Sequence, residues 1–410
     1  MPKLLQINVD SALYSCGKIC EDIAIVAQSK GWNTYIAYGR EHKDGVNHEI
    51  RVGNMFYVYE HYFEQRFFDN EGCASRIPTK KLVKIIKEIA PDVIQLHVIH
   101  DHWLNYSVLF NYLATLNIPI VWTLHDCWPF TGGCFYYDLE NCDRWKTQCE
   151  SCPQKRSFLL DQTERQFKKR KKLYGALQNL TLVPVSNWLA ESARTSILKD
   201  KRIVTIHNGI NLSIFKPTSS GKKDKEIFEI IGVAAVWDRR KGLDDFIKLR
   251  AILPSIFHIT LVGLKKEQIE KLPEGIIGIQ KTYNVEELVQ LYSDADVFVN
   301  TTYSDNFPTT NIEALACGCP VITYNTGGSP EAICDDTSII DQLESTSFET
   351  GYVVPQGKIT EVAKVIKNMA EMPETDRLKQ REACRIRAEQ NFDKNNCFKK
   401  YLSLYEELNG

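Results

Sequence analysis

The sequence predicts an α/β protein made of two doubly wound, Rossmann-like domains. Short apolar runs rich in Val, Ile and Leu recur along the chain without strict alternation, as in parallel strands that are buried on both faces. Longer segments with helical periodicity separate these runs. The same alternation of apolar runs and helical segments begins again after a polar stretch that starts at Thr218. At roughly 150 residues per domain, a chain of 410 residues is long enough for two such domains.

Each expected strand follows from one of these apolar runs. In the first half of the chain the runs cover residues 4–9, 34–38, 93–97, 118–124, 180–185 and 203–206. Helical patterns lie between them, for example over residues 19–29 and 79–89. In the second half the expected strands cover residues 228–235, 258–262, 276–279, 297–301 and 321–324.

The domain boundary is expected near residues 207–225, where an Asn-Gly turn and Pro217 interrupt the pattern. The predicted domains are therefore residues 1–212 and 213–390, and residues 391–410 form a final helix that is expected to pack back on the first domain. Ligands of open parallel sheets bind beyond the carboxyl ends of the strands, so the functional residues should follow strands directly.

Composition excludes several classes of protein. The chain carries 50 Lys and Arg against 52 Asp and Glu, a formal charge of −2, which lacks the basic excess of a general nucleic-acid binder. The first ten residues are too short and polar for a signal peptide, which predicts a cytoplasmic protein. Thirteen cysteines are too few for a disulfide scaffold and are expected to be thiols or metal ligands.

The segment after the run at 297–301 carries the most informative pattern. A polar loop with Asp305 leads to Pro308, which is tolerated at a helix start because its missing N–H would be unpaired there. The first amides of that helix, at Thr309 and Thr310, suit an anion such as a diphosphate. Glu313 lies one turn further on, where a carboxylate can accept hydrogen bonds from both hydroxyls of a ribose.

This segment resembles the E-x7-E signature of the retaining glycosyltransferases of family 4, with Asp305 and Glu313 at the two acidic positions. The first position is Asp instead of Glu, so its side chain is one methylene shorter. Further motifs follow the family's order: Thr123-Leu124-His125-Asp126, Asn208-Gly209-Ile210, Arg240-Lys241-Gly242 and Gly327-Gly328-Ser329-Pro330-Glu331.

The resemblance implies the GT-B fold, with two Rossmann-like domains facing a central cleft. It also implies transfer of a sugar from a nucleotide diphosphate sugar, UDP- or GDP-linked, to a hydroxyl acceptor with retention at the anomeric carbon. Similar sequences look like capsule, exopolysaccharide or O-antigen assembly enzymes, so a glycan or lipid-linked acceptor is expected. Two alternatives are a nucleotide-sugar epimerase of the same fold and a non-catalytic sugar-nucleotide binder.

The resemblance also assigns cations to the donor diphosphate. Family members use an Arg and a Lys after the first strand of the second domain. The family's earlier Arg position falls among Ala234, Ala235 and Val236, so Arg240 is assigned to it, with Arg239 as the alternative, and Lys241 is the lysine. The only obvious Asp-x-Asp match, at 294–296, reads as a helix end and strand entry, so no catalytic metal is expected. The predicted donor-binding residues are Glu313, Thr309, Thr310, Asn311, Gly17 and Gly263.

Several histidines follow strand ends in the first domain. His125 matches the family's cleft histidine, which contacts the transferred sugar, and Asp126 is expected to orient it. His97 and His100 are predicted to line the acceptor side, although each is equally consistent with a structural role. The alternative for Glu313 is a helix-surface carboxylate, and the alternative for Asp305 is a loop or helix-capping aspartate. The alternative for Arg240 and Lys241 is a solvated basic turn.

Two further segments remain open at this level. An insert at residues 127–153 is rich in cysteine and aromatic residues, and four of its cysteines could complete a structural zinc site or remain thiols or disulfides: Cys134, Cys142, Cys149 and Cys152. The basic run at 165–172 is expected either to contact an anionic membrane or to form a solvated helix face.

Overall fold

The structure is a computed structural model that describes residues 1–154, 157–218 and 227–409, so the linker predicted at 207–225 lies partly outside the described residues. The chain divides into two compact units. Unit 1 comprises Met1–His207 together with Asn395–Gly410, and unit 2 comprises Asn208–Lys394. The division after His207 lies five residues before the predicted boundary at 212, and the final segment groups with unit 1.

Unit 1 is built on a parallel sheet of seven strands in the order β3-β2-β1-β4-β5-β6-β7. Its strands are β1 (Lys3–Ile7), β2 (Asn33–Tyr38), β3 (His48–Arg51), β4 (Val93–Leu96), β5 (Ile120–Leu124), β6 (Leu180–Pro184) and β7 (Arg202–Ile203). The central strands β4, β5 and β6 are buried at every position, which explains their unbroken apolar runs.

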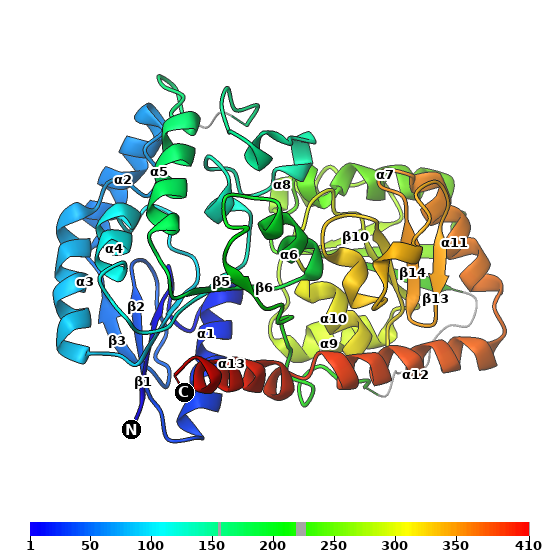
Figure 1. Ribbon diagram of the computed structural model, residues 1–410. Helices are drawn as coiled ribbons and strands as arrows, with labels where there is room; N and C mark the ends of the chain where they lie inside the picture. Colours follow the sequence, from blue (N-terminus) through cyan, green and yellow to red (C-terminus); the bar gives the residue numbers. More distant parts are fainter. Residues whose placement is uncertain (155–156, 219–226, 410) are drawn as a thin grey trace. The chain divides into compact units, whose positions relative to one another are not determined.

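Helices cover both faces of this sheet (Figure 1). They are α1 (Tyr14–Gln28), α2 (Met55–Phe68), α3 (Arg76–Ile89), α4 (Tyr106–Leu113), α5 (Thr163–Gly175), α6 (Asn187–Arg194) and the C-terminal α13 (Lys394–Asn409). Helix α13 lies beside α1 and buries Phe398, Tyr401 and Tyr405 in the same hydrophobic core (Figure 1). The Tyr405 hydroxyl donates to the Gln95 side chain in β4, which ties the end of the chain to the middle of the sheet.

Unit 2 has a second sheet of seven strands, in the order β10-β9-β8-β11-β12-β14-β13. Its strands are β8 (Phe228–Val233), β9 (Phe257–Val262), β10 (Ile276–Ile279), β11 (Val297–Asn300), β12 (Val321–Tyr324), β13 (Thr346–Phe348) and β14 (Gly351–Val354). All pairs are parallel except β13 with β14, which is antiparallel.

The helices of unit 2 are α7 (Leu243–Ile252), α8 (Lys266–Ile269), α9 (Val285–Asp294), α10 (Thr309–Ala316), α11 (Ile359–Glu371) and α12 (Glu374–Asn391). Helix α12 lies along α10, and the Arg385 guanidinium donates to the carbonyl oxygen of Ala316 at the end of α10 at 2.9 Å. A cation at a helix C-terminus satisfies the last carbonyls and interacts favourably with the helix dipole.

The structure corrects several expected elements. Helix α1 begins at Tyr14, five residues before the expected start at residue 19. The strand expected at 203–206 is only the two-residue β7. Strands β3, β13 and β14 were not expected at all. No helix among the described residues is long and apolar enough to cross a membrane.

Candidate functional site

In each unit the strand order reverses beside the first strand, and the predicted site residues lie at the carboxyl edge of that sheet. In unit 1 the reversal lies between β1 and β4, and in unit 2 it lies between β8 and β11. The loops leaving two such strands diverge to opposite faces of the sheet and leave a crevice at its carboxyl edge, which is where open α/β sheets bind ligands. We therefore describe the residues at this edge in each unit separately.

In unit 2 the loops after β8 and β11 bring two cations to one carboxylate. The Lys241 ammonium lies 2.5 Å from Asp305 Oδ2, and the Arg240 guanidinium lies 3.7 Å from the same oxygen. The three side chains are 16–20% exposed, so this cluster is partly withdrawn from solvent without being sealed. Arg240 also donates to the carbonyl oxygen of Ser304 at 3.0 Å, which fixes its direction.

Glycines allow the backbone to close around this cluster. Gly327, at φ 53°, packs so tightly that an added Cβ would stand 2.0 Å from the carbonyl oxygen of Asp305, and the Gly328 N–H donates to that oxygen at 3.1 Å. At the end of β9, Gly263 has φ 98°, and a Cβ there would stand 1.7 Å from the carbonyl oxygen of Ala234. Both positions therefore require glycine.

Helix α10 carries the remaining predicted donor residues. It starts at Thr309, after Pro308 at the N-cap, which provides no side-chain cap for the first-turn amides of Thr309 and Thr310. Glu313 is half-buried, and the Tyr292 hydroxyl donates to its Oε2 at 3.3 Å.

The side chain of Asn311, a predicted donor-binding residue, lies inside unit 2. It is completely buried, accepts from the Asn300 amide at 2.7 Å and donates to the carbonyl oxygen of Ser329 at 3.1 Å. It therefore ties α10 to β11 and to the Gly-Gly-Ser-Pro-Glu segment. The Asp-x-Asp match is a helix end and a strand entry, because α9 ends at Asp294 and β11 begins at Val297.

In unit 1 two imidazoles meet at the carboxyl edge of the sheet. His97 Nδ1 lies 3.1 Å from His125 Nε2, and the rings stack with centroids 5.4 Å apart. Burial lowers the pKa of His125 to about 4 and the pKa of His97 well below its usual value. Both rings are therefore neutral at physiological pH.

The hydrogen-bond network assigns the tautomers of this pair. The Gln6 amide nitrogen donates to the Cys20 carbonyl oxygen, so Gln6 Oε1 is left to accept from His97 Nε2 at 3.3 Å. A neutral ring that donates through Nε2 accepts at Nδ1, and therefore the His125 Nε2–H is the donor between the two histidines. This leaves His125 Nδ1 as an acceptor.

Asp126 does not orient His125 as the sequence suggested. Its Oδ2 lies 2.8 Å from His100 Nε2, and its Oδ1 accepts from the Trp128 N–H at 2.8 Å. Burial opposes the charge on this carboxylate, but the His100 imidazole and the Trp128 amide hold its pKa below the usual range. The His125 ring contacts His97, a pairing that residue spacing did not reveal.

Gly17 lies in the first turns of α1, where the backbone of the preceding loop approaches closely. An added Cβ would stand 3.2 Å from the Ala12 amide nitrogen. The residue lines an open pocket at the end of β1, together with Asp10, Arg40 and Asp101. Arg40 and Asp101 form an ion pair at 2.6 Å across this pocket, and neither was predicted as a site residue.

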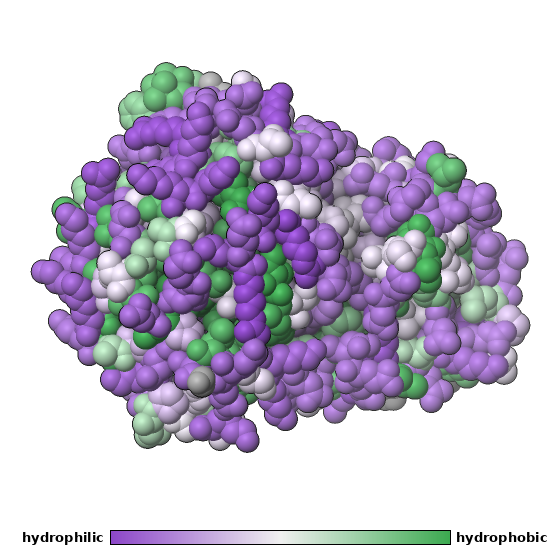
Figure 2. All heavy atoms as spheres, viewed as in Figure 1, coloured by the Kyte–Doolittle hydropathy of each residue, from purple (hydrophilic) through white to green (hydrophobic). Residues whose placement is uncertain are grey.

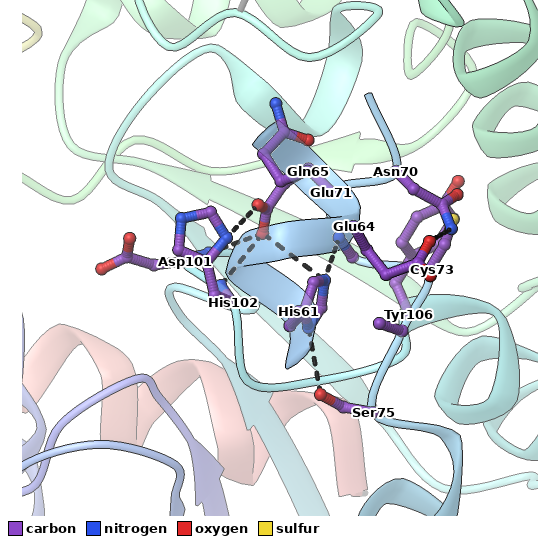
Figure 3. Close-up of polar contacts among 12 residues, drawn as sticks. His61, Glu64, Gln65, Asn70, Glu71, Cys73, Ser75, Asp101, His102 and Tyr106 are labelled. Atoms are coloured by element: carbon purple, nitrogen blue, oxygen red, sulfur yellow. Dashed lines mark hydrogen bonds and ion pairs between the residues drawn. The ribbon is translucent and has the colours of Figure 1, made fainter. Parts of the chain in front are cut away.

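A buried carboxylate holds the loop that carries Asp101. Glu71 accepts from the backbone N–H groups of Asp101 and His102 at 2.9 and 3.1 Å, and its Oε2 lies 2.6 Å from His102 Nδ1 (Figure 3). Burial opposes the charge on Glu71, yet the His102 bonds hold the Glu71 pKa well below its usual value, and the same contact raises the pKa of His102. His61 is neutral beside them, because burial lowers its pKa and its Nε2 accepts from the Gly72 N–H.

The comparisons with known proteins identify the family. Residues 22–214 match the model described as Glycosyltransferase Family 4, and residues 215–391 match the model described as Glycosyl transferases group 1. The chain belongs to the family 4 glycosyltransferases.

Relatives and solved structures agree with this assignment. WcaC of Escherichia coli K12, named as a colanic acid biosynthesis glycosyl transferase, is 22% identical over 365 residues, which cover 80% of this chain and 85% of WcaC. Among solved structures, sucrose-phosphate synthase from Thermosynechococcus elongatus matches with TM-score 0.70 at 18% identity, covering 100% of this chain and 99% of that one. Anabaena HepE in complex with UDP and glucose matches with TM-score 0.62 at 17% identity, covering 99% and 100%. The two seven-stranded units are thus the Rossmann-like units of the GT-B fold.

In this glycosyltransferase the cysteine-rich insert packs directly beside the histidines. The ring centroids of Trp128 and Phe135 lie 5.0 and 4.8 Å from the ring centroid of His100.

The basic run at 165–172 contains both buried and exposed cations. Arg170 is completely buried, stacks on the Trp128 ring at 3.6 Å and donates to two backbone carbonyls, whereas Arg165, Lys168, Lys171 and Lys172 are exposed. Arg170 therefore anchors the insert and cannot reach a membrane.

Proposed function

We propose that this chain is a retaining glycosyltransferase that moves a hexose or related sugar from a nucleotide diphosphate sugar to a hydroxyl of a surface-polysaccharide intermediate. The observation that carries the proposal is the pair of cations on Asp305 at the strand reversal of unit 2. Fixed Arg and Lys side chains neutralise a diphosphate without a divalent metal, and they stabilise it most when charge develops on the departing phosphate. WcaC's name supports the polysaccharide, and HepE's bound UDP supports UDP as the nucleotide.

Each proposed donor contact has a physical reason. The diphosphate displaces Asp305 from Lys241 and Arg240, which frees the carboxylate to accept from hydroxyls of the sugar. The first amides of α10, at Thr309 and Thr310, complete the anion site, and Glu313 accepts from the ribose hydroxyls. In this assignment Asp305 holds the cations in position until the donor arrives.

Unit 1 is proposed to bind the acceptor. At its edge His97 and His125 present neutral imidazoles, and Asp126 presents a carboxylate that His100 contacts. Neutral imidazoles suit hydroxyl groups better than they suit phosphate. The tautomers assigned above make His125 Nδ1 a hydrogen-bond acceptor.

A lipid-linked acceptor at the inner face of the cytoplasmic membrane fits a surface of unit 1. Aromatic side chains of α2 are exposed, including Phe56 at 71%, Tyr59 at 60% and Phe63 at 58%. The loop before α5 adds Phe158 at 59% and Leu159 at 62%, and hydrophobic atoms gather over this loop in Figure 2. Two backbone hydrogen bonds hold that loop against the end of α2.

The exposed cations of α5 follow directly in sequence and suit anionic headgroups, while aromatic rings suit the bilayer interface. Sedimentation with vesicles tests this contact. Binding to vesicles with anionic phospholipid, reduced by Lys168→Gln/Lys171→Gln and by Phe158→Ser, is expected. If equal amounts of protein sediment with neutral and anionic vesicles, or if no protein binds either kind, the proposed membrane contact is wrong.

The donor proposal is tested by thermal unfolding in EDTA with UDP, GDP and ADP and their sugar conjugates. A ligand at one hundred times its dissociation constant stabilises the folded protein by about 2.7 kcal/mol. The cognate diphosphate is therefore expected to raise the melting temperature more than the other nucleotides do. Acceptor-dependent UDP release supports the transferase, and NMR of the new glycosidic bond tests retention. Release of a free sugar without acceptor indicates the epimerase, and absence of any nucleotide effect contradicts the donor site.

A further inference from the structure

One small cavity of unit 1 is lined by four cysteines among other residues. It lies within the insert, has a volume of about 20 Å³ and is bordered by Gly132, Trp145 and Thr163. Four of its other lining residues are cysteines, which we call the cysteine quartet: Cys134, Cys142, Cys149 and Cys152. A cavity of this size holds one water-sized sphere, so it has room for a single ion and not for an organic ligand.

We propose that the cysteine quartet binds one structural zinc ion. None of the thirteen cysteines, all of which lie in the described residues, is in a disulfide. Tetrahedral coordination by four cysteine sulfurs is a common form of structural zinc, and it leaves no open position for chemistry. The ion would therefore hold the insert and take no part in sugar transfer.

The surroundings of the quartet suit bound thiolates. The Gly132 N–H donates to Cys149 Sγ at 3.2 Å, which is the type of second-shell bond that stabilises a metal-bound sulfur. An added Cβ at Gly132 would stand 2.9 Å from the Cβ of Cys149, so only glycine permits this approach. The Arg144 guanidinium borders the same cavity and is held there by the carbonyl oxygens of Glu150 and Ser151.

Metal binding requires the sulfurs to move together. Among the described residues, the one group of three or more possible ligands whose atoms all lie within 4.8 Å of one another is His42, Asp44 and Glu49. Zinc–sulfur bonds of about 2.3 Å place tetrahedral sulfurs about 3.8 Å apart, so the quartet must contract around the ion. The insert can contract because its regular structure is limited to three 3-10 turns of three residues each, at 128–130, 138–140 and 144–146.

The more compact group at His42 does not carry a proposal of its own. Two of its three residues are exposed, and carboxylates on a surface commonly gather without a metal. The quartet differs because its residues enclose a cavity and present sulfur, which binds zinc far more tightly than exposed carboxylates do.

Zinc at the quartet would act on the acceptor-side residues through the insert. Trp145 is buried against Phe130, with ring centroids 5.2 Å apart, and the Cys127 N–H donates to the Phe135 carbonyl oxygen at 3.0 Å. Phe135 in turn packs on the His100 ring. A fixed insert therefore keeps His100 on Asp126, which makes the quartet a positioning element for unit 1.

The test measures metal on the full chain, purified without a histidine tag from medium supplied with zinc. Elemental analysis is expected to find about one zinc per chain. In the double variant Cys149→Ser/Cys152→Ser, zinc is expected to fall at least tenfold. The matched control is Cys384→Ser in α12, another buried cysteine that lies outside the insert, and it is expected to retain wild-type zinc.

A second measurement guards against misfolding of the double variant. Cobalt added to the metal-free wild-type chain is expected to give the visible absorption of a tetrahedral tetrathiolate site, and added zinc is expected to abolish it. The proposal is overturned if the wild-type chain takes up neither metal, if the double variant binds as much zinc as the control, or if intact mass shows a disulfide within the quartet after purification in reducing buffer.

Discussion

The substitution Glu71→Gln tests whether the buried carboxylate holds the Asp101–His102 loop. Glu71 is 4% exposed and accepts from two backbone amides in addition to the His102 side chain. A glutamine keeps one acceptor oxygen, but its amide group then faces N–H donors and cannot satisfy them. Asp101 and His102 also have φ of 78° and 68°, a left-handed conformation that costs energy and that these bonds offset.

The magnitude follows from the burial and charge of the pair. Removing one member of a buried ion pair costs about 3–5 kcal/mol of unfolding free energy. We expect the lower part of that range, about 3 kcal/mol, because a glutamine preserves volume and one hydrogen bond. The control Glu229→Gln removes a pair with His258 in which both side chains are well exposed, and it is expected to change the unfolding free energy by less than about 1 kcal/mol.

The effect of Glu71→Gln should also depend on pH. The folded pKa of His102 is raised, so its contribution to stability is complete below the unfolded value of about 6.5 and is lost as pH rises through the folded value. The folded pKa of Glu71 is lowered, so its contribution is present above the unfolded value of about 4.3 and is lost only on strong acidification. The destabilisation should therefore be larger at pH 6 than at pH 9.

Denaturant unfolding followed by tryptophan fluorescence measures this effect in unit 1. Six of the seven tryptophans lie in that unit, and Trp237 alone lies in unit 2. A loss below about 1 kcal/mol at pH 6, or the same loss at pH 6 and pH 9, would refute the reasoning. Glu71→Gln combined with His102→Gln should be less destabilised than the sum of the single variants, because the two residues act as a pair.

Four further predictions concern the two site edges. Lys241→Gln is expected to weaken UDP binding by roughly 10- to 100-fold in calorimetry, because one charge-assisted bond is lost, and unchanged affinity would remove Lys241 from the donor site. Gly263→Ala is expected to lower unfolding free energy by more than about 2 kcal/mol, because its methyl group meets the Ala234 carbonyl, and a wild-type melting temperature would contradict this packing. His125→Gln is expected to reduce kcat while leaving UDP affinity in calorimetry unchanged, and weaker UDP binding would instead place this residue on the donor. EDTA in the assay is expected to leave UDP release unchanged, whereas restoration of lost activity by Mg²⁺ or Mn²⁺ would show that a metal assists the leaving group.

The strands that are buried at every position could be predicted from the sequence, whereas the exposed edge strands β3 and β13 could not. Strands such as β5 are buried at every residue, so they appear in the sequence as continuous apolar runs. Strand β3, with the sequence His-Glu-Ile-Arg, is buried at none of its four positions and lies at the edge of the sheet. Strand β13 is likewise an edge strand without a buried residue. A strand without a buried residue leaves no hydrophobic pattern to detect.

Some residues of the candidate site could likewise be predicted from the sequence, and others could not. The Arg240, Lys241 and Asp305 cluster was predicted as individual residues because each follows a strand, and parallel strands place their ends at one edge. Glu71 was missed because it precedes α3 in an ordinary polar stretch, and its partner lies 31 residues further along the chain. Only tertiary packing makes its carboxylate buried and multiply bonded. The partner of His125 was misassigned for a related reason, since adjacency in sequence favoured Asp126 over His97.

The charged groups at the two sheet edges differ, and so do the ligands that each edge favours. At the strand reversal of unit 2, two permanent cations share one partly buried carboxylate, so the cluster carries excess positive charge that a diphosphate can neutralise. At the reversal of unit 1, burial keeps His97 and His125 neutral. A neutral imidazole pair offers hydrogen bonds without attracting anions, which favours hydroxyl groups over phosphate at that edge. Because burial lowers the pKa of His125 to about 4, this edge carries no imidazolium charge from His125 near neutral pH.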